Sequence, residues 1–159
     1  MSAPRIRPMV KADLEVVGTI AGGLVRLHHG FDPRRFFLEP GVEDGYRWFF
    51  SKQLGKPGVV LLVAEVSDSV VGYVYGSLES RDWAKLLDAH GAIHDVFVDP
   101  GARRQGVARA LMEAAVSALE GAGAAQVVLS SASQNVAAQA LFRAMGFRET
   151  MVEMTFSRS

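Results

Sequence analysis

Cysteine and an excess of charge of either sign are both absent from this chain of 159 residues. Without cysteine there is no disulfide bond, no zinc site built on thiolates and no cysteine nucleophile. The 17 Lys and Arg residues balance the 17 Asp and Glu residues, so the formal net charge is zero. Because binding of nucleic acid through bulk electrostatics needs a positive excess, we expect no nucleic-acid partner.

Long hydrophobic runs are absent as well. The apolar runs are interrupted every few residues, far short of the length, about 20 residues, that spans a bilayer. Residues 1–8 are polar and interrupted by proline, with no apolar segment behind them, which is unlike a secretory signal. We therefore expect a cytoplasmic protein without a membrane partner.

The composition that remains is typical of one folded domain. Hydrophobic residues make up 49% of the chain and charged residues 21%, as in globular proteins. A chain of 159 residues suits a single hydrophobic core, so we expect one domain over residues 1–159. His28 and His29 are adjacent, and His90 and His94 run from a loop into a strand rather than along one helical face. The histidines therefore predict no metal site.

Hydrophobic periodicity and turn residues predict an α/β (α+β) domain built around a mixed sheet. One helix is expected to begin at residue 11, and others to cover residues 42–54, 107–119 and 136–145. Strands are expected at residues 5–9, 59–64, 70–78, 92–98, 126–130 and 149–156. Residues 28–41, rich in Pro, Gly, Arg and Phe, are predicted to be loop or irregular helix. The predicted order of elements is β-α-α-β-β-β-α-β-α-β.

The most informative stretch joins the strand at residues 92–98 to the helix that follows it. Residues 99–109 read Asp-Pro-Gly-Ala-Arg-Arg-Gln-Gly-Val-Ala-Arg. The first amides of a helix have no internal partner and lie at the positive end of the helix dipole, which favours an anion. Gly106 lets a phosphate approach the backbone closely, and Ala108 keeps a nearby position small. The turn therefore predicts a phosphate-binding site.

Other phosphate-binding motifs fit this turn less well. A Walker A loop needs Lys and then Ser or Thr after Gly106, where the chain has Val107 and Ala108. A dinucleotide fingerprint needs three glycines, and only Gly106 is suitably placed. Taken alone, the turn is also compatible with an ordinary strand, turn and helix in which Arg103 and Arg104 are solvated.

A second motif, Asn-Val-Ala-Ala-Gln-Ala-Leu-Phe-Arg-Ala-Met-Gly-Phe, occupies residues 135–147. Together the two motifs resemble those of the GNAT family of N-acetyltransferases. The cofactor motif of that family, Arg/Gln-x-x-Gly-x-Gly/Ala, is met by Arg103, Gly106 and Ala108. Its later motif, Asn-x-x-Ala-x-x-Leu-Tyr-x-x-x-Gly-Phe, is met at Asn135, Ala138, Leu141, Gly146 and Phe147. The order of elements also matches, so the resemblance covers essentially the whole chain and implies a GNAT-like, mostly antiparallel sheet flanked by helices.

This resemblance implies an enzyme that transfers an acetyl group from acetyl-CoA to a primary amine of a small molecule, amino acid or peptide. The amides of residues 104–109 would hold the coenzyme A pyrophosphate, and the backbone of residues 96–98 would pair with the pantetheine arm like an added strand. A backbone amide near Val96 or Phe97 would stabilise the oxyanion, and Asn135 would face the pantetheine from the other side. The cofactor-binding residues implied are Val96, Phe97, Val98, Arg103, Arg104, Gln105, Gly106, Val107, Ala108, Arg109, Asn135, Ala138 and Phe142.

The chemistry also needs a group that removes a proton from the amine. Neutralising an amine with a pKa near 10.4 costs about 4–5 kcal/mol at pH 7, and a general base lowers that barrier. His94 and Asp95 are the candidate catalytic residues because they directly precede the cofactor-binding segment. By resemblance to polyamine-acetylating relatives, His94 occupies the position of the proposed base. Strand alternation predicts that the two side chains lie on opposite faces of the sheet, so that only one lines the cleft.

One position departs from the family pattern. Many members have a tyrosine, proposed to protonate the departing thiolate, where this chain has Phe142. A thiolate with a pKa near 8.5 can leave unprotonated at a cost of about 2 kcal/mol at pH 7, and water, Tyr73 or Tyr75 are substitutes that the sequence leaves open. The alternative is therefore a non-catalytic acyl-CoA-binding regulatory module of the same fold.

The resemblance implies that the acceptor pocket is built from residues 27–50 and 80–90. Glu43 and Asp44 offer attraction for a cationic amine, whereas Arg34 and Arg35 offer attraction for a carboxylate. Both signs of charge are present, so the acceptor stays open. Family members often pair through sheet edges or helices, so the resemblance also allows a homodimer.

Overall fold

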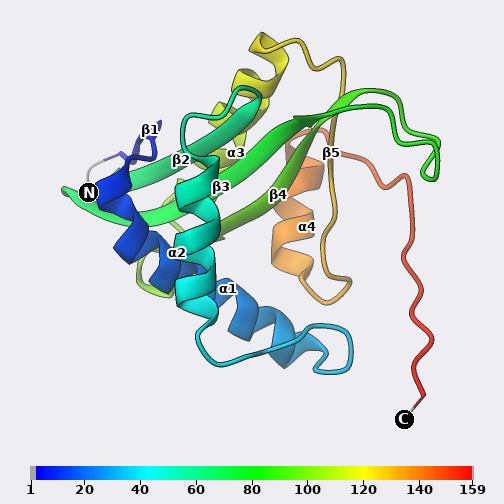
Figure 1. Ribbon diagram of the computed structural model, residues 1–159, viewed down its shortest axis with the longest axis horizontal. Helices are drawn as coiled ribbons and strands as arrows, with labels where there is room; N and C mark the ends of the chain where they lie inside the picture. Colours follow the sequence, from blue (N-terminus) through cyan, green and yellow to red (C-terminus); the bar gives the residue numbers. More distant parts are fainter. Residues whose placement is uncertain (1–2, 159) are drawn as a thin grey trace.

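A five-stranded sheet with helices on both faces forms the body of the protein (Figure 1). The computed structural model describes residues 3–158. The strands are β1 (Arg5–Pro8), β2 (Val59–Val66), β3 (Ser69–Glu79), β4 (His90–Val98) and β5 (Val127–Leu129). The helices are α1 (Leu14–Phe31), α2 (Val42–Gln53), α3 (Val107–Gly121) and α4 (Val136–Ala144), with short 3-10 turns η1 (Lys11–Asp13) and η2 (Pro100–Ala102).

The strand order follows the chain, β1-β2-β3-β4-β5. The first four strands pair antiparallel with their neighbours, and only β5 runs parallel to its neighbour β4. Ser67 and Asp68, both at positive φ, form the two-residue turn between β2 and β3, the turn type whose twist suits a hairpin. The prediction of a mixed, mostly antiparallel sheet is therefore confirmed.

Two hydrophobic layers hold the helices to the sheet, because neighbouring strand residues point to opposite faces. On β3, Val74 packs on the face covered by α3, against Leu111 and the rest of that layer. Its neighbour Tyr73 packs on the face covered by α1 and α2, against Phe50. Both layers are continuous across the central strands, so the sheet is a rigid support for the groups at the ends of β3 and β4.

The structure differs from the predicted elements at two places. Residues 28–31, expected to be loop or irregular helix, continue the regular helix α1, which ends where Asp32 takes an extended conformation before Pro33. Residues 149–156, expected to be a strand, lie extended without pairing to any strand within residues 3–158. Figure 1 shows this segment running away from the sheet. Its alternating sequence favours a strand, but a strand also needs a neighbour that supplies hydrogen bonds, and its own sheet does not supply one.

None of the helices within residues 3–158 combines the length and apolar character that crossing a membrane requires.

Candidate active site

A bulge in β4 brings both candidate catalytic residues to one face of the sheet. Tyr75 pairs with Asp95 whereas Gly76 pairs with Ile93, so His94 is an extra residue in the ladder. Such an insertion breaks the alternation of side chains. The ring of His94 lies 4.8 Å from that of Tyr75, and Asp95 contacts Tyr73, on the same face of β3. The prediction that His94 and Asp95 lie on opposite faces is therefore wrong.

A short chain of hydrogen bonds through Ser77 orients His94. The hydroxyl of Ser77 donates to Oε1 of Glu79 at 2.7 Å, and Nε2 of His94 lies 2.7 Å from the same hydroxyl oxygen. A serine hydroxyl has one hydrogen. Because that hydrogen goes to Glu79, Nε2 of His94 donates to Ser77, and its lone pair lies on Nδ1 in the neutral ring. Nε2 also lies 3.5 Å from Glu79, which can stabilise the protonated ring.

Asp95 sits in a different environment, among tyrosine side chains. Burial raises the pKa of Asp95 above its usual value, while the hydroxyl of Tyr73, which donates to Oδ2 at 3.3 Å, opposes that rise. Burial, together with the charge of Asp95, raises the pKa of Tyr46 to about 12. Tyr73 has a raised pKa for the same two reasons. The tyrosines therefore keep their protons at neutral pH, and Asp95 is the acidic group of this cluster.

The outer edge of β4 is open beyond Ile93. Pairing between β4 and β5 ends at Ile93 and Leu129, although β4 continues to Val98. The amide of Asp99 donates to the carbonyl of Val71 next to β3 at 2.7 Å. Because backbone groups alternate along an antiparallel ladder, Phe97 also points its backbone toward β3, and Val96 and Val98 point theirs toward the open edge. Of the three expected pantetheine partners, two thus face the gap.

Free amides lie at the end of this open edge, in the first turn of α3. The helix has 15 residues and begins after Gly106, which takes φ +74°. Its first backbone bond runs from the amide of Ala110 to the carbonyl of Gly106 at 3.0 Å. The amides of Val107, Ala108 and Arg109 precede that bond and have no acceptor within the helix. A Cβ on Gly106 would meet no heavy atom within 4 Å. This open, amide-lined turn fits a diphosphate.

The side chains of the same turn have mixed surroundings. Nε of Arg103 donates to the carbonyl of Val98 at 3.2 Å, and its guanidinium lies 5.0 Å from the ring centre of Phe97. Arg109 pairs with Glu113 at 3.0 Å. Oε1 of Gln105 is buried without a hydrogen-bond partner within residues 3–158. Such an atom is costly unless a donor reaches it.

The later motif builds the start of α4. Oδ1 of Asn135 accepts from the amide of Ala138 at 3.2 Å and so caps the helix. This cap fixes Asn135 in the connection that follows β5, across the gap from β4. Phe142 is only 7% exposed and packs in the α3-side layer, with its ring 6.0 Å from that of Phe147. The phenyl group thus stabilises the support beneath the cleft.

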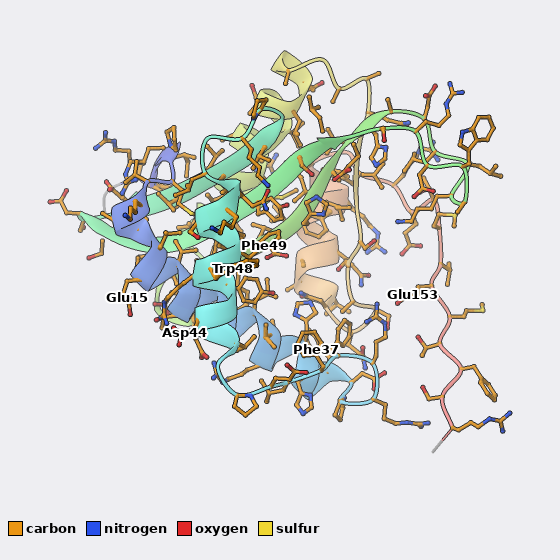
Figure 2. The ribbon with its side chains drawn as sticks, in the orientation of Figure 1. Glu15, Phe37, Asp44, Trp48, Phe49 and Glu153 are labelled. Carbon is orange, nitrogen blue, oxygen red and sulfur yellow. The ribbon has the colours of Figure 1, made fainter. Side chains whose placement is uncertain are left out.

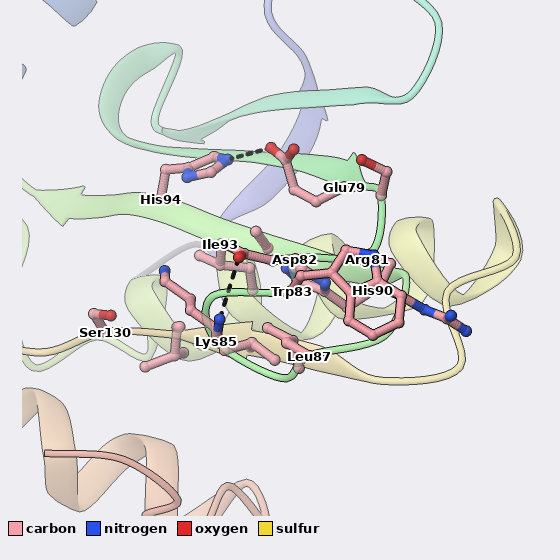
Figure 3. Close-up of a pocket in the computed structure, with 14 residues that line it drawn as sticks. Glu79, Arg81, Asp82, Trp83, Lys85, Leu87, His90, Ile93, His94 and Ser130 are labelled. Carbon is pink, nitrogen blue, oxygen red and sulfur yellow. Dashed lines mark hydrogen bonds and ion pairs between the residues drawn. The ribbon is translucent and has the colours of Figure 1, made fainter.

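A pocket of about 540 Å³ lies beside His94, which is one of its lining residues (Figure 3). It is lined by the connection between β3 and β4, including Asp82 and Trp83, and by the end of β5 at Leu129 and Ser130. The pocket therefore lies between residues 80–90, one of the two predicted acceptor segments, and the open edge of β4.

Two polar groups of this site have no counterpart among the predicted residues. Ser77 and Glu79 belong to neither sequence motif, and only the register between β3 and β4 brings them to His94. Within residues 3–158, no group of three or more His, Asp or Glu side chains is arranged to hold a metal ion.

Known proteins share both the sequence pattern and the fold. Residues 24–147 match the Acetyltransferase (GNAT) family. Human N-acetyltransferase 8 is 34% identical over 97 residues, which are 61% of this chain and 42% of that protein. The chain thus spans less than half the length of this curated relative.

Solved structures extend the likeness to almost every residue. A single-site mutant of the BH1408 protein from Bacillus halodurans has a TM-score of 0.84 at 18% identity, covering 98% of this chain and 99% of that one. A predicted acetyltransferase from Clostridium acetobutylicum, solved with acetyl-CoA, has a TM-score of 0.71 at 14% identity, covering 97% and 96%. At such identities these structures establish the fold, and the sequence match establishes the family: the chain belongs to the acetyltransferase (GNAT) family.

Proposed function

We propose that this protein is an acetyl-CoA-dependent N-acetyltransferase that acts on a primary amine. The observation that carries the proposal is that three features follow one another: the free amides of the α3 turn, the open edge of β4, and His94. The acetyl-CoA found in the Clostridium acetobutylicum relative supports the choice of donor. When bound, acetyl-CoA supplies an acetyl group activated as a thioester.

The chain's own groups have distinct roles along this path. The amides of residues 107–109 bind the diphosphate, aided by the positive end of the α3 dipole and by the charge of Arg104. The backbone of Val96 and Val98 pairs with the amides of the pantetheine arm, and Asn135 borders the arm from α4. The amide of Val96 donates to the oxygen on which negative charge develops.

His94 removes the proton from the attacking amine. Its bond to Ser77 fixes the hydrogen on Nε2, so Nδ1 is the basic atom. A histidine ring is the side chain that most often serves as a general base. The nitrogen–carbon bond forms as the carbon–sulfur bond breaks, the electron pair leaves on sulfur, and Nδ1 takes the proton of the amine. Glu79, 3.5 Å from Nε2, then stabilises the charged ring.

The acceptor amine enters through the pocket of about 540 Å³ beside His94. The pocket wall carries both signs of charge, with Glu79 and Asp82 beside Arg81 and Lys85, and Trp83 offers an apolar surface to the rest of the acceptor. These groups suit a small amine or an exposed peptide amine, and their balanced charges select no sign of charge for the rest of the acceptor.

The test is acetyl transfer from acetyl-CoA across a panel of amines, followed by the release of free thiol. Because the chain has no cysteine, a thiol reagent reads only released coenzyme A. We expect thiol release that depends on the amine. His94→Gln should lower kcat/KM roughly 100-fold or more.

Ser77→Ala separates the positioning of His94 from its chemistry. Loss of the hydroxyl frees the histidine tautomer and should lower kcat about 10-fold with little change in KM for acetyl-CoA. Ser51→Ala, at an exposed serine on α2, is the matched control and should leave both constants unchanged. Binding of acetyl-CoA without transfer to any amine would contradict catalysis and favour the regulatory module instead.

A further inference from the structure

The pocket beside His94 lies beyond α2, on the face of the sheet that this helix covers elsewhere. The ring of Phe49, on α2, lies 5.6 Å from that of Tyr75, and Glu79 follows Tyr75 on the same face of β3. Figure 2 shows Trp48 and Phe49 on α2, and the connection between β3 and β4 extending away from this helix at the far end of the sheet. That connection and the sheet line the pocket together.

Alternate residues of β4 face this pocket. A Cβ added to Gly91 would lie 3.1 Å from the Cβ of Leu119 on α3, so position 91 faces α3. Its neighbours His90 and Ala92 therefore face the other way, and both line the pocket. The pocket thus has a histidine toward each end, His90 and His94, with the small Ala92 between them (Figure 3).

The hydrogen bonds of His90 leave one ring nitrogen free. Nδ1 of His90 lies 2.8 Å from the carbonyl oxygen of Asp88. Because a carbonyl only accepts, Nδ1 carries the hydrogen, and Nε2 of the neutral ring carries a lone pair. Within residues 3–158, no donor reaches Nε2, although His90 is only 9% exposed. A buried acceptor without a donor is costly, so a molecule in the pocket that supplies the donor gains affinity.

The direction of the ring selects the pocket over a second hollow nearby. His90 also borders a space of about 460 Å³, together with residues 122–126. A Cβ on Gly91 would lie 3.3 Å from the Cβ of Ala124, so residues 122–126 lie on the face opposite to the ring of His90. The ring instead shares its face with Glu79, its partner in the ladder, which lines the pocket.

We propose that His90 determines specificity for the acceptor, which is an amino alcohol whose hydroxyl donates to Nε2 of His90 while its amine lies at His94. This inference rests on the proposed function, because His94 marks the reacting end of the acceptor. At a rise of about 3.3 Å per residue, the two histidines stand roughly 10 Å apart along β4, so the hydroxyl lies several bonds from the amine. A hydroxyl both donates and accepts, so it can pair with Nε2 whether or not the ring is protonated, whereas an ammonium group only donates.

Acetyl transfer to a matched pair of amines tests this role. 5-Aminopentan-1-ol and hexylamine have the same length and differ only in a terminal hydroxyl or methyl group. We expect kcat/KM of the wild type to favour the amino alcohol at least 10-fold, chiefly through KM. His90→Phe keeps a flat ring but removes the acceptor, so it should abolish this preference. The ratio of the two constants does not depend on the fraction of folded enzyme, so lower stability of the variant cannot imitate the result.

Two further variants define the contact. His90→Gln, whose amide oxygen can accept in place of Nε2, should restore part of the preference. Gln126→Ala, at an exposed side chain beside the smaller hollow, is the matched control and should keep the full preference. Equal constants for both amines in the wild type, a preference that survives His90→Phe, or a stronger preference for 1,5-diaminopentane than for the amino alcohol would each overturn the inference.

Nitrogen NMR of the histidine rings separates this inference from the proposed activity. 5-Aminopentan-1-ol, added to the wild type with coenzyme A present, should shift the Nε2 resonance of His90, and hexylamine at the same concentration should shift it less. A resonance that responds to neither amine, or equally to both, would contradict the role of His90. If the resonance shifts as expected but no amine is acetylated, only the proposed function fails.

Discussion

Asp95 is a carboxyl group whose charged form is disfavoured by burial. It lies against Tyr73, and burial raises its pKa. Between the usual pKa of 3.8 and the raised value, the folded state holds a proton that the unfolded state has released. The stability that this protonation contributes is complete below pH 3.8 and is lost as pH rises through the folded pKa.

Asp95→Asn removes the charge without changing the shape of the side chain. The variant should be more stable than the wild type at pH 7, and the difference should shrink toward pH 4, where the wild-type carboxyl also becomes neutral. Free energies of unfolding by urea at several pH values measure this. Asp68→Asn, in the exposed hairpin turn, is the control. An Asp95→Asn effect that is independent of pH would contradict the assignment.

For single residues, the sequence predicts which side chains are candidates for the site better than it predicts the face of the sheet to which they point. His94 and Asp95 were predicted as catalytic candidates, but the bulge that turns both to one face arises from pairing with β3, which no local pattern records. Ser77 and Glu79 were not predicted, because strand register alone brings them to His94.

Among the elements, β1, η1 and β2 are joined by one arginine. Arg7 on β1 donates from Nη1 and Nη2 to the two carboxylate oxygens of Asp13 at 2.7 and 2.9 Å, and from Nε to Glu65 on β2 at 2.7 Å. Asp13 is buried and also accepts from the amide of Val10 at 2.8 Å. Asp13 is therefore bound mainly to the strand before it, and this network fixes where α1 starts.

Arg7→Ala leaves Asp13 buried without its cation and should cost about 3 kcal/mol in the free energy of unfolding. Arg5→Ala is the control, because the side chain of Arg5 is 75% exposed and lies 3.8 Å from Glu65; it should cost less than about 1 kcal/mol. The hydrogen bond from Arg7 lowers the pKa of Asp13. The stability that the charged form of Asp13 contributes is present above pH 3.8 and is lost as pH falls through its folded pKa. The free energies of unfolding of the wild type and of Arg7→Ala should therefore converge in acid. Equal costs for both variants would show that the network is not structural.

Element types were largely predictable because periodicity is local. Strand alternation, helix caps and turns each depend on residues that are only a few positions apart in the sequence, as at the starts of α3 and α4. Residues 149–156 show the limit: their alternation is a property of the segment, whereas strand pairing depends on the neighbouring sheet edge. The early end of β5 is likewise set by the sheet, and that ending opens the edge of β4.

For the whole molecule, the family follows from motifs at both sides of the cleft. Gly106 and Asn135 are separated in sequence but lie on the two elements, α3 and α4, that border the gap beside β4. The acceptor was not predictable, because the pocket proposed for it is lined largely by a connection, residues 80–90, whose side chains follow no shared pattern. The fold thus defines the donor site more closely than the acceptor site.

Calorimetric titration with acetyl-CoA tests the donor site most directly. The wild type should bind at micromolar concentration. Arg104→Glu, which places a carboxylate beside the α3 amides, should weaken binding at least 10-fold, whereas Arg148→Glu, an exposed residue beyond α4, should bind like the wild type. Folded wild-type protein that does not bind acetyl-CoA, or an Arg104→Glu variant that binds it with full affinity, would contradict the placement of the cofactor at this turn.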